Sequence, residues 1–99
     1  MLTQQGDVLM TKVDEIPSGL KPKADQVVAE GEATGHRHVA RGDGLVVLEA
    51  DDTMYIDAPN GGIVVHEEHD VVTLSPGKFE RRIVQEYDHF AEETREVRD

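Results

Sequence analysis

The sequence predicts an all-β domain, built as a small antiparallel barrel or as a jelly-roll-like sandwich with a short C-terminal helix or tail. Short apolar segments are separated by Gly, Pro, Asp and Asn, a pattern typical of strands joined by turns. The strict alternation of strands and helices that produces a parallel sheet is missing from the sequence. The length of 99 residues suits one domain over residues 1–99, with residues 88–99 as an acidic helical or frayed tail.

In the first half of the chain, alternating apolar residues predict a first strand within residues 6–13. Residues 14–25 contain two prolines and a glycine, and we expect a long loop there. Further strands are expected within residues 26–33, 35–40, 45–50 and 53–57, with turns at 41–44, 51–52 and 58–62.

In the second half, the apolar segments 63–66 and 69–74 flank Glu67-Glu68 and indicate a hairpin with a two-residue loop. Because Glu-Glu is poor chemistry for such a turn, a longer loop, a bulged bend or a helical turn stays open, and each would also keep His66 and His69 close. Ser75-Pro76-Gly77-Lys78 has the composition of a type II turn. The last strand, residues 78–87, has no purely apolar face, which favours a place at an edge or an interface. Asp88 is a candidate helix cap for the tail.

Charge and composition exclude several classes of protein. The chain has 21 acidic against 10 basic residues, a formal charge of −11, which disfavours nucleic acid and anionic membranes as partners. Cysteine is absent, so a metal would be held by imidazole and carboxylate. No signal peptide or apolar run of membrane-spanning length is seen, and we expect a cytoplasmic protein. The small aromatic content of 4% favours a homo-oligomer, such as a dimer, or a bound ion as a source of stability.

Four of the five histidines form two close pairs. His36 and His38 would point to the same face of a strand, because side chains alternate between faces. His66 and His69 would meet across the loop between the two strands of the predicted hairpin. These four residues are the predicted ligands of a divalent transition metal such as Zn, Fe, Ni or Mn. Glu32, Glu67 and Glu68 are candidate carboxylate ligands or second-shell partners, and His89 is expected to be solvated.

The sequence leaves the function open between two classes. In the first, the protein binds metal, and an open coordination position would allow hydrolysis or oxygen chemistry with Glu32 or Glu68 as general base. In the second, it is a non-catalytic module for protein interaction or oligomerisation, without metal. A nucleophilic hydrolase is disfavoured, because Ser18 and Ser75 lie next to prolines and no G-x-S-x-G motif is present. A small-molecule ligand is possible, but the sequence does not specify one.

Two resemblances follow from these motifs. GEATGHRHV resembles the first motif of the cupin superfamily, and LSPG is similar to the Pro-x-Gly turn of the second. The resemblance implies a jelly-roll barrel, often dimeric, with a metal held by His36, His38 and a later histidine, His66 or His69. Gly42 and Asp43 stand where the cupin motif has its glutamate ligand. The chain also resembles small uncharacterised bacterial proteins with GxxTGHxH and HEEH motifs, which implies no particular chemistry.

Overall fold

The computed structural model describes residues 2–30, 36–51 and 53–84, and within these ranges it contains ten β-strands and no helix. The strands are β1 (Leu2–Gln5), β2 (Val8–Val13), β3 (Lys21–Lys23), β4 (Val27–Glu30), β5 (Arg37–Arg41), β6 (Val46–Ala50), β7 (Thr53–Ala58), β8 (Gly62–Val65), β9 (Val72–Leu74) and β10 (Gly77–Ile83). The predicted all-β class is confirmed. The predicted tail at residues 88–99 lies outside the described residues. Among the described residues there is no helix with the length and apolar character needed to cross a membrane.

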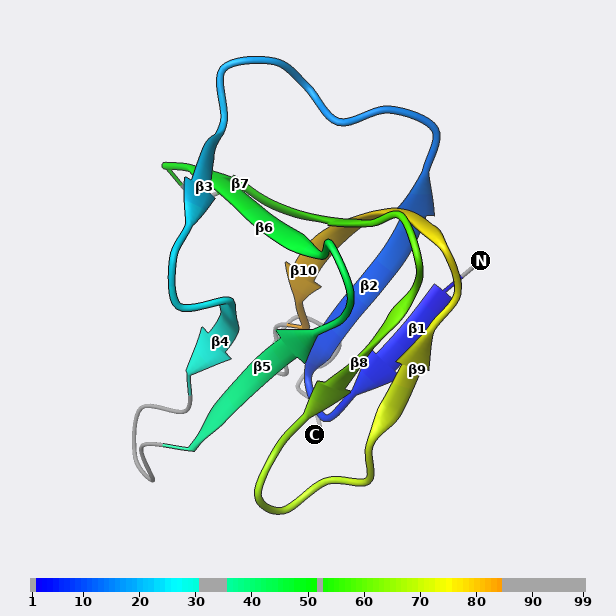
Figure 1. Ribbon diagram of the computed structural model, residues 1–99. Coiled ribbons are helices and arrows are strands. Elements are labelled where there is room, and N and C mark those ends of the chain that lie inside the picture. Colours follow the sequence, from blue (N-terminus) through cyan, green and yellow to red (C-terminus); the bar gives the residue numbers. More distant parts are fainter. Residues whose placement is uncertain (1, 31–35, 52, 85–99) are drawn as a thin grey trace.

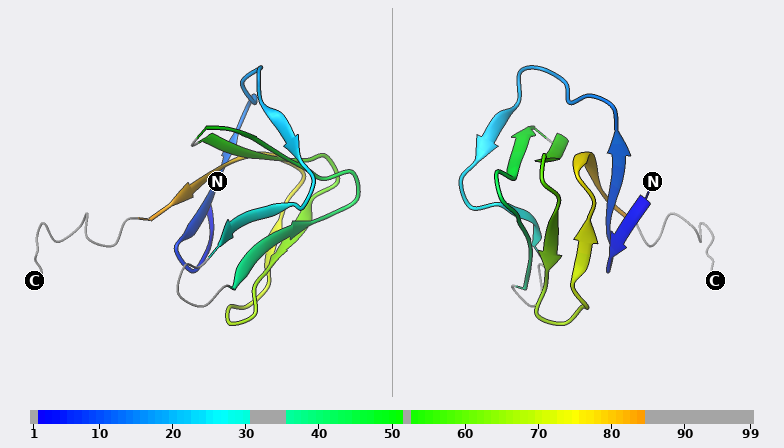
Figure 2. Two further views of the ribbon diagram at one scale, coloured as in Figure 1. Left: turned by 90° about the vertical axis from the view of Figure 1, so that its left-hand side faces the viewer. Right: turned by 45° about the vertical axis from the view of Figure 1, so that its right-hand side comes forward.

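The strands form two antiparallel sheets that face each other (Figure 1 and Figure 2). The larger sheet has the strand order β1-β2-β10-β7-β6-β3, and the smaller has the order β4-β5-β8-β9. The described strands do not close into a barrel, because each sheet keeps an edge strand at both sides. Of the two architectures expected from the sequence, the two-sheet arrangement is the one observed.

One hydrophobic core fills the space between the sheets. The larger sheet contributes Phe79, Met10 and Ile56, and the smaller sheet contributes Val64 and Ala40, all with no exposed surface. Full burial of a side chain such as Phe79 or Ile56 stabilises the fold by roughly 1.5–3 kcal/mol. The inward positions of β5 and β8 are therefore fixed by packing, and the neighbouring residues of these strands must point outward.

The predicted first strand is in fact the second strand of a hairpin. Gln5 pairs with Val8, so Gly6 and Asp7 form a two-residue loop between β1 and β2. Gly6 has a φ of 59°, which suits the first central position of a type II′ turn. The start of the sequence did not reveal β1, because its two glutamines interrupt any apolar alternation. Similarly, the predicted loop over residues 14–25 contains the short strand β3, which pairs with β6.

Of the two positions expected for the last strand, the edge is wrong, and the interface stays a prediction. β10 is paired on both sides, with β2 and with β7. Phe79 faces the core, and Arg81 lies on the same face, in register with Met10 and Met54. Burial lowers the pKa of the Arg81 guanidinium, and the charge of Glu49 opposes this effect. The mixed composition of this strand therefore reflects a charged group turned toward the interior, and not a free edge.

The two turns around β9 also differ from the prediction. β8 and β9 pair through Val64 and Val72, so the connection between them is longer than the predicted Glu67-Glu68 loop. The segment containing Pro76 carries the chain from β9 in the smaller sheet to β10 in the larger one. Gly77 has a φ of 152° and already belongs to β10, which does not fit the expected type II turn.

Candidate metal centre

The candidate site begins on β5, where residues alternate between the two faces of the smaller sheet. His38 points inward and is only 5% exposed, while Arg37 and Val39 lie on the outer face. His36 directly precedes the strand and is half-buried. The H-x-H spacing thus places one buried and one half-buried imidazole at the same end of the smaller sheet.

The second histidine pair lies in the connection between β8 and β9. His66 follows the last residue of β8 and is half-buried, and His69 is exposed. The ring centroids of His38 and His66 are 4.2 Å apart, and those of His66 and His69 are 4.6 Å apart. His36 lies 5.6 Å from His66, and His38 lies 5.9 Å from His69. The fold therefore brings the four imidazoles into one cluster, although the loop is longer than expected.

Gln5, at the end of β1, fixes the buried member of this cluster. Its side-chain Nε2 donates to the backbone carbonyl oxygens of Val64, at 2.9 Å, and Asp70, at 2.8 Å. The amide orientation is thereby determined, and its Oε1 faces Nδ1 of His38 at 2.9 Å. Because Oε1 can only accept, the neutral His38 ring carries its proton on Nδ1. The lone pair is then on Nε2, which is the tautomer of a metal-ligating histidine whose other nitrogen is held by a hydrogen bond.

Two acidic side chains accompany the imidazoles. Oε1 of Glu67 accepts a hydrogen bond from the backbone N–H of Arg37 at 3.3 Å, and Oε1 of Glu68 lies 3.5 Å from Nδ1 of His36. The ligand atoms of His36, His66 and Glu67 all lie within 4.8 Å of one another. The backbone N–H of Glu68 donates to Nδ1 of His66 at 3.0 Å, so the neutral ring carries its proton on Nε2, and metal binding by His66 would require Nδ1 to exchange this hydrogen bond for the ion. The third predicted carboxylate, Glu32, lies outside the described residues.

Burial favours the uncharged form of His38. Desolvation lowers the pKa of His38, and the nearby His66 lowers it further. The pKa of Glu67 is lowered mainly by a hydrogen bond from its own backbone N–H. A neutral His38 near an ionised Glu67 offers an imidazole and a carboxylate, which are ligand types that divalent transition metals accept.

The family of the chain follows from a match that spans the site. A model for a domain of unknown function, DUF8820, matches residues 4–84. The chain belongs to the DUF8820 family. The match includes both histidine pairs and Gln5, and it ends at Val84, the last residue that the structure describes. No curated protein and no solved structure matches the chain.

Two residues of the DUF8820 site were missed by the sequence analysis. The sequence pattern does not single out Gln5 as a site residue, and it places Gly6 only at the start of a strand. A Cβ atom on Gly6 would lie 2.7 Å from Nε2 of His69, so the His69 ring packs against the β1–β2 turn. The signal that could have revealed both is the Gly6-Asp7 pair before an alternating strand, which is typical of a two-residue hairpin loop.

Proposed function

We propose that this DUF8820 protein binds a divalent transition metal at the end of the smaller sheet, with ligands drawn from His36, His38, His66 and His69. Glu67 is the proposed carboxylate ligand. The observation that carries the proposal is the cluster of four imidazoles, in which the ring centroids of His38 and His66 are 4.2 Å apart and those of His66 and His69 are 4.6 Å apart. A structural histidine needs no such arrangement, since a single hydrogen bond satisfies it.

The donor atoms of His36, His66 and Glu67 are close enough for a shared ion after small side-chain movements. Bonds of about 2.0–2.1 Å from zinc to nitrogen place tetrahedral ligand atoms roughly 3.3 Å apart. The ligand atoms of His36, His66 and Glu67 lie within 4.8 Å in the absence of an ion. Two of these residues are on the loop after β8, where side chains adjust without disturbing the core.

Zinc titration of untagged, chelator-stripped protein tests the proposal. We expect one Zn²⁺ per chain, and a blue Co²⁺ derivative if the site is tetrahedral. The pairs of substitutions H36A/H38A and H66A/H69A should each weaken zinc binding by more than about 100-fold, because each removes two ligands. E67Q should weaken binding by about tenfold, whereas the exposed control E15Q in the loop after β2 should not change it.

The proposal is wrong if Zn²⁺, Co²⁺, Ni²⁺ and Mn²⁺ all bind more weakly than about 1 mM, as scattered surface histidines do. If E67Q binds zinc as tightly as E15Q while the histidine variants lose zinc binding, Glu67 alone is removed from the set of ligands. The resemblance to cupins stays an expectation, and a metal bound by His36 and His38 is what it implies.

Oligomerisation is the second candidate function, and the proposed partner is another copy of this chain. Leu2 and Val71 are both 58% exposed, and they lie at the side where edge strands β1 and β9 are neighbours. Unpaired edge strands and exposed apolar side chains favour association. Light scattering of the wild type and of L2S/V71S should show a dimer that becomes a monomer; a monomeric wild type would exclude this candidate.

A further inference from the structure

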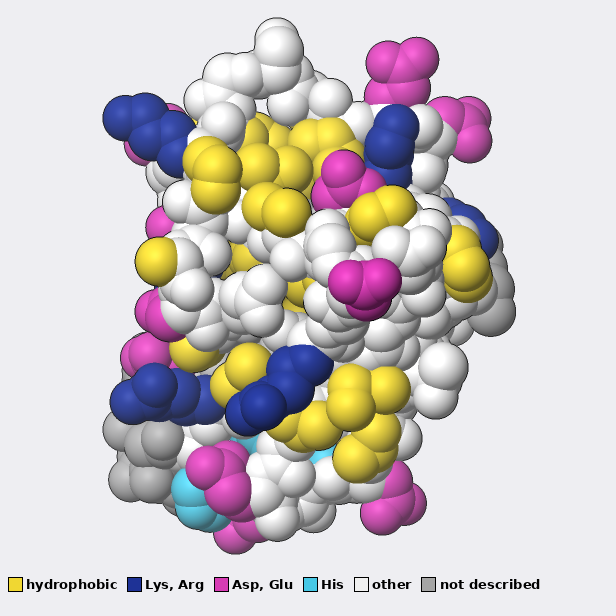
Figure 3. Space-filling view, in the orientation of Figure 1, with side chains coloured by type: hydrophobic (Ala, Val, Ile, Leu, Met, Phe, Trp, Pro, Cys, Tyr) yellow, Lys and Arg dark blue, Asp and Glu magenta, His cyan; other side chains and the backbone are white. Residues whose placement is uncertain are grey.

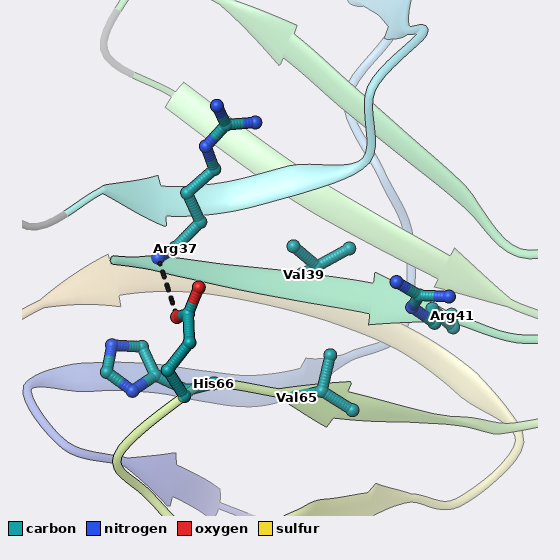
Figure 4. A pocket seen from close by; sticks show the side chains of 6 residues that line it. Arg37, Val39, Arg41, Val65 and His66 are labelled. Carbon is teal, nitrogen blue, oxygen red and sulfur yellow. Dashed lines mark hydrogen bonds between the residues drawn. The ribbon is translucent and has the colours of Figure 1, made fainter. Parts of the chain in front are cut away.

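The outer face of the smaller sheet carries a pocket that the metal cluster does not explain. The pocket has a volume of about 520 Å³ and is lined by Arg37, Val39 and Arg41 from β5, Val65 from β8, and His66 and Glu67 after it. Val39 and Val65 are direct partners in the β5–β8 ladder and form its apolar floor. Figure 4 shows the two arginines at either end of this floor, with Glu67 turned toward the Arg37 end.

The two guanidinium groups stand out in a chain with a formal charge of −11. Among the described residues, the ion pairs involve Lys23, His36 and Arg82, and neither Arg37 nor Arg41 is in a salt bridge, although Glu30 lies opposite Arg37 in the β4–β5 ladder. Figure 3 shows basic side chains next to hydrophobic ones on this face, above the histidines. Exposed arginines beside apolar surface, with no salt bridge of their own, suit an anionic ligand.

We propose that this pocket binds a small organic carboxylate with an apolar body. The carboxylate pairs with an arginine at one end, and the apolar chain lies on Val39 and Val65. A volume of about 520 Å³ is within the range of small-molecule sites. Arg37 and Arg41 are four residues apart on one strand, which separates their Cα atoms by about 13 Å. One guanidinium group therefore lies at each end of an elongated ligand site.

The inference goes beyond the proposed metal site and does not depend on it. The pocket lies on the outer face of the smaller sheet, whereas His38 is on the inner face of the same strand. The two sites touch at His66 and Glu67, which line the pocket and also belong to the cluster. Ligand binding can therefore be measured in chelator-stripped protein, with no metal present.

Octanoate is the probe for this site, and its binding to the full chain is measured by ¹⁵N NMR in the presence of EDTA. We expect octanoate to shift the amide signals of residues 37–41 and 63–67 with a Kd of about 0.1–1 mM. Acetate, which lacks the apolar body, and octyltrimethylammonium, which reverses the charge, should each bind at least tenfold more weakly. A second titration with zinc-loaded protein shows whether the ion alters the affinity.

Variants separate the charge from the apolar floor. R37Q and R41Q should each weaken octanoate binding only about twofold, because a single carboxylate pairs with one arginine at a time, whereas R37Q/R41Q should weaken it about three- to tenfold, a modest loss because both side chains are exposed. V39T keeps the side-chain shape but makes the floor polar, and it should weaken binding by a similar factor. R82Q is the matched control, because it removes one exposed positive charge from the larger sheet and should bind octanoate like the wild type.

Three results would overturn the inference. The first is an octanoate titration that leaves residues 37–41 and 63–67 unshifted. The second is an R37Q/R41Q protein that binds octanoate like R82Q. The third is a dimer that dissociates on R37Q/R41Q substitution, which would make this face a contact between two copies. A failed zinc titration leaves the carboxylate site standing, since all of these measurements are made without metal.

Discussion

The two ends of the smaller sheet are closed in different ways. At one end, glycines allow backbones to meet: a Cβ on Gly42 would lie 2.5 Å from the carbonyl oxygen of Gly61, and one on Gly62 would lie 2.5 Å from that of Arg41. At the other end, the histidines and Gln5 fill the space with polar side chains joined by hydrogen bonds. The comparison therefore separates an end closed by backbone contacts from the proposed binding end.

The largest effect is expected at the binding end, from Gln5→Ala. This change leaves the carbonyl oxygens of Val64 and Asp70 and Nδ1 of His38 without their partner, so we expect a loss of about 3 kcal/mol in the free energy of unfolding. Zinc affinity should also fall about 10- to 100-fold, since His38 loses its fixed tautomer. Gln4→Ala, which removes only a local hydrogen bond to Gly6, should stay within about 0.5 kcal/mol. Urea denaturation and zinc titration measure both; equal results for the two variants would contradict the role of Gln5.

At the structural end, Gly62→Ala should cost about 2 kcal/mol, because the added Cβ meets a carbonyl oxygen of β5. The zinc affinity of the folded protein should not change, since Gly62 is at the opposite end of β8 from His66. Thermal unfolding with and without zinc provides the measurement. A large loss of zinc affinity in this variant would show that the two ends are not independent.

Gly6→Ala and Gly19→Ala form a matched pair. Both glycines have positive φ, 59° and 92°, so both substitutions strain the backbone by about 1 kcal/mol. Only at Gly6 would the new Cβ meet an imidazole, that of His69, whereas no atom lies within 4 Å at Gly19. We expect Gly6→Ala to cost about 1 kcal/mol more and to weaken zinc binding several-fold. Identical behaviour of the two variants in urea denaturation and zinc titration would exclude His69 from the site.

The stability of metal-free protein should depend on pH through His38. Its pKa is lowered in the folded state, mainly by burial, so the unfolded chain takes up a proton more readily. The stability that neutral His38 provides is therefore complete above the unfolded pKa of about 6.5 and is lost as the pH falls through the lower folded pKa. Urea midpoints from pH 8 to pH 5 should show a steeper decrease for the wild type than for His38→Asn. The asparagine amide can still donate to Gln5 but does not titrate. Parallel curves would contradict this assignment.

Arg81→Met should have the smallest effect, between neutral and about 1 kcal/mol stabilising. The guanidinium faces the interior, and its Nε has no hydrogen-bond partner among the described residues. An apolar side chain of similar length removes this desolvation cost. Urea denaturation measures the change. A clear loss of stability would show that attraction to Glu49 outweighs burial.

Much of the fold could be predicted from local patterns, and the exceptions have physical causes. Turn residues and apolar alternation gave the strands around β5 to β8, because both signals act over a few residues. β1 could not be predicted in this way, since Gln5 is buried by hydrogen bonds and not by apolar packing. The position of β10 in the sheet depends on which strands pair with it, and no local pattern determines this. In addition, the charged Arg81 lies on the inner face of β10, so that face does not have the apolar composition expected of a buried one.

The candidate site was predictable in its histidines but not in its support. The i, i+2 spacing of His36 and His38 identifies a shared face without knowledge of the fold. The approach of His66 to His38 requires β5 and β8 to be neighbours, which no local pattern determines. Metal binding by these residues stays a prediction, and so does the role of Glu32.

The reach of Gln5 has a consequence for how the protein should be handled. Its two carbonyl partners are 59 and 65 residues away along the chain, so the orientation of His38 depends on the pairing of the first strand. Loss of a few residues from the amino terminus, or a bulky fusion that keeps β1 from pairing, would leave every histidine in the chain but remove the hydrogen bond that orients His38. If the proposed metal site exists, preparations with a modified amino terminus are expected to understate its metal content.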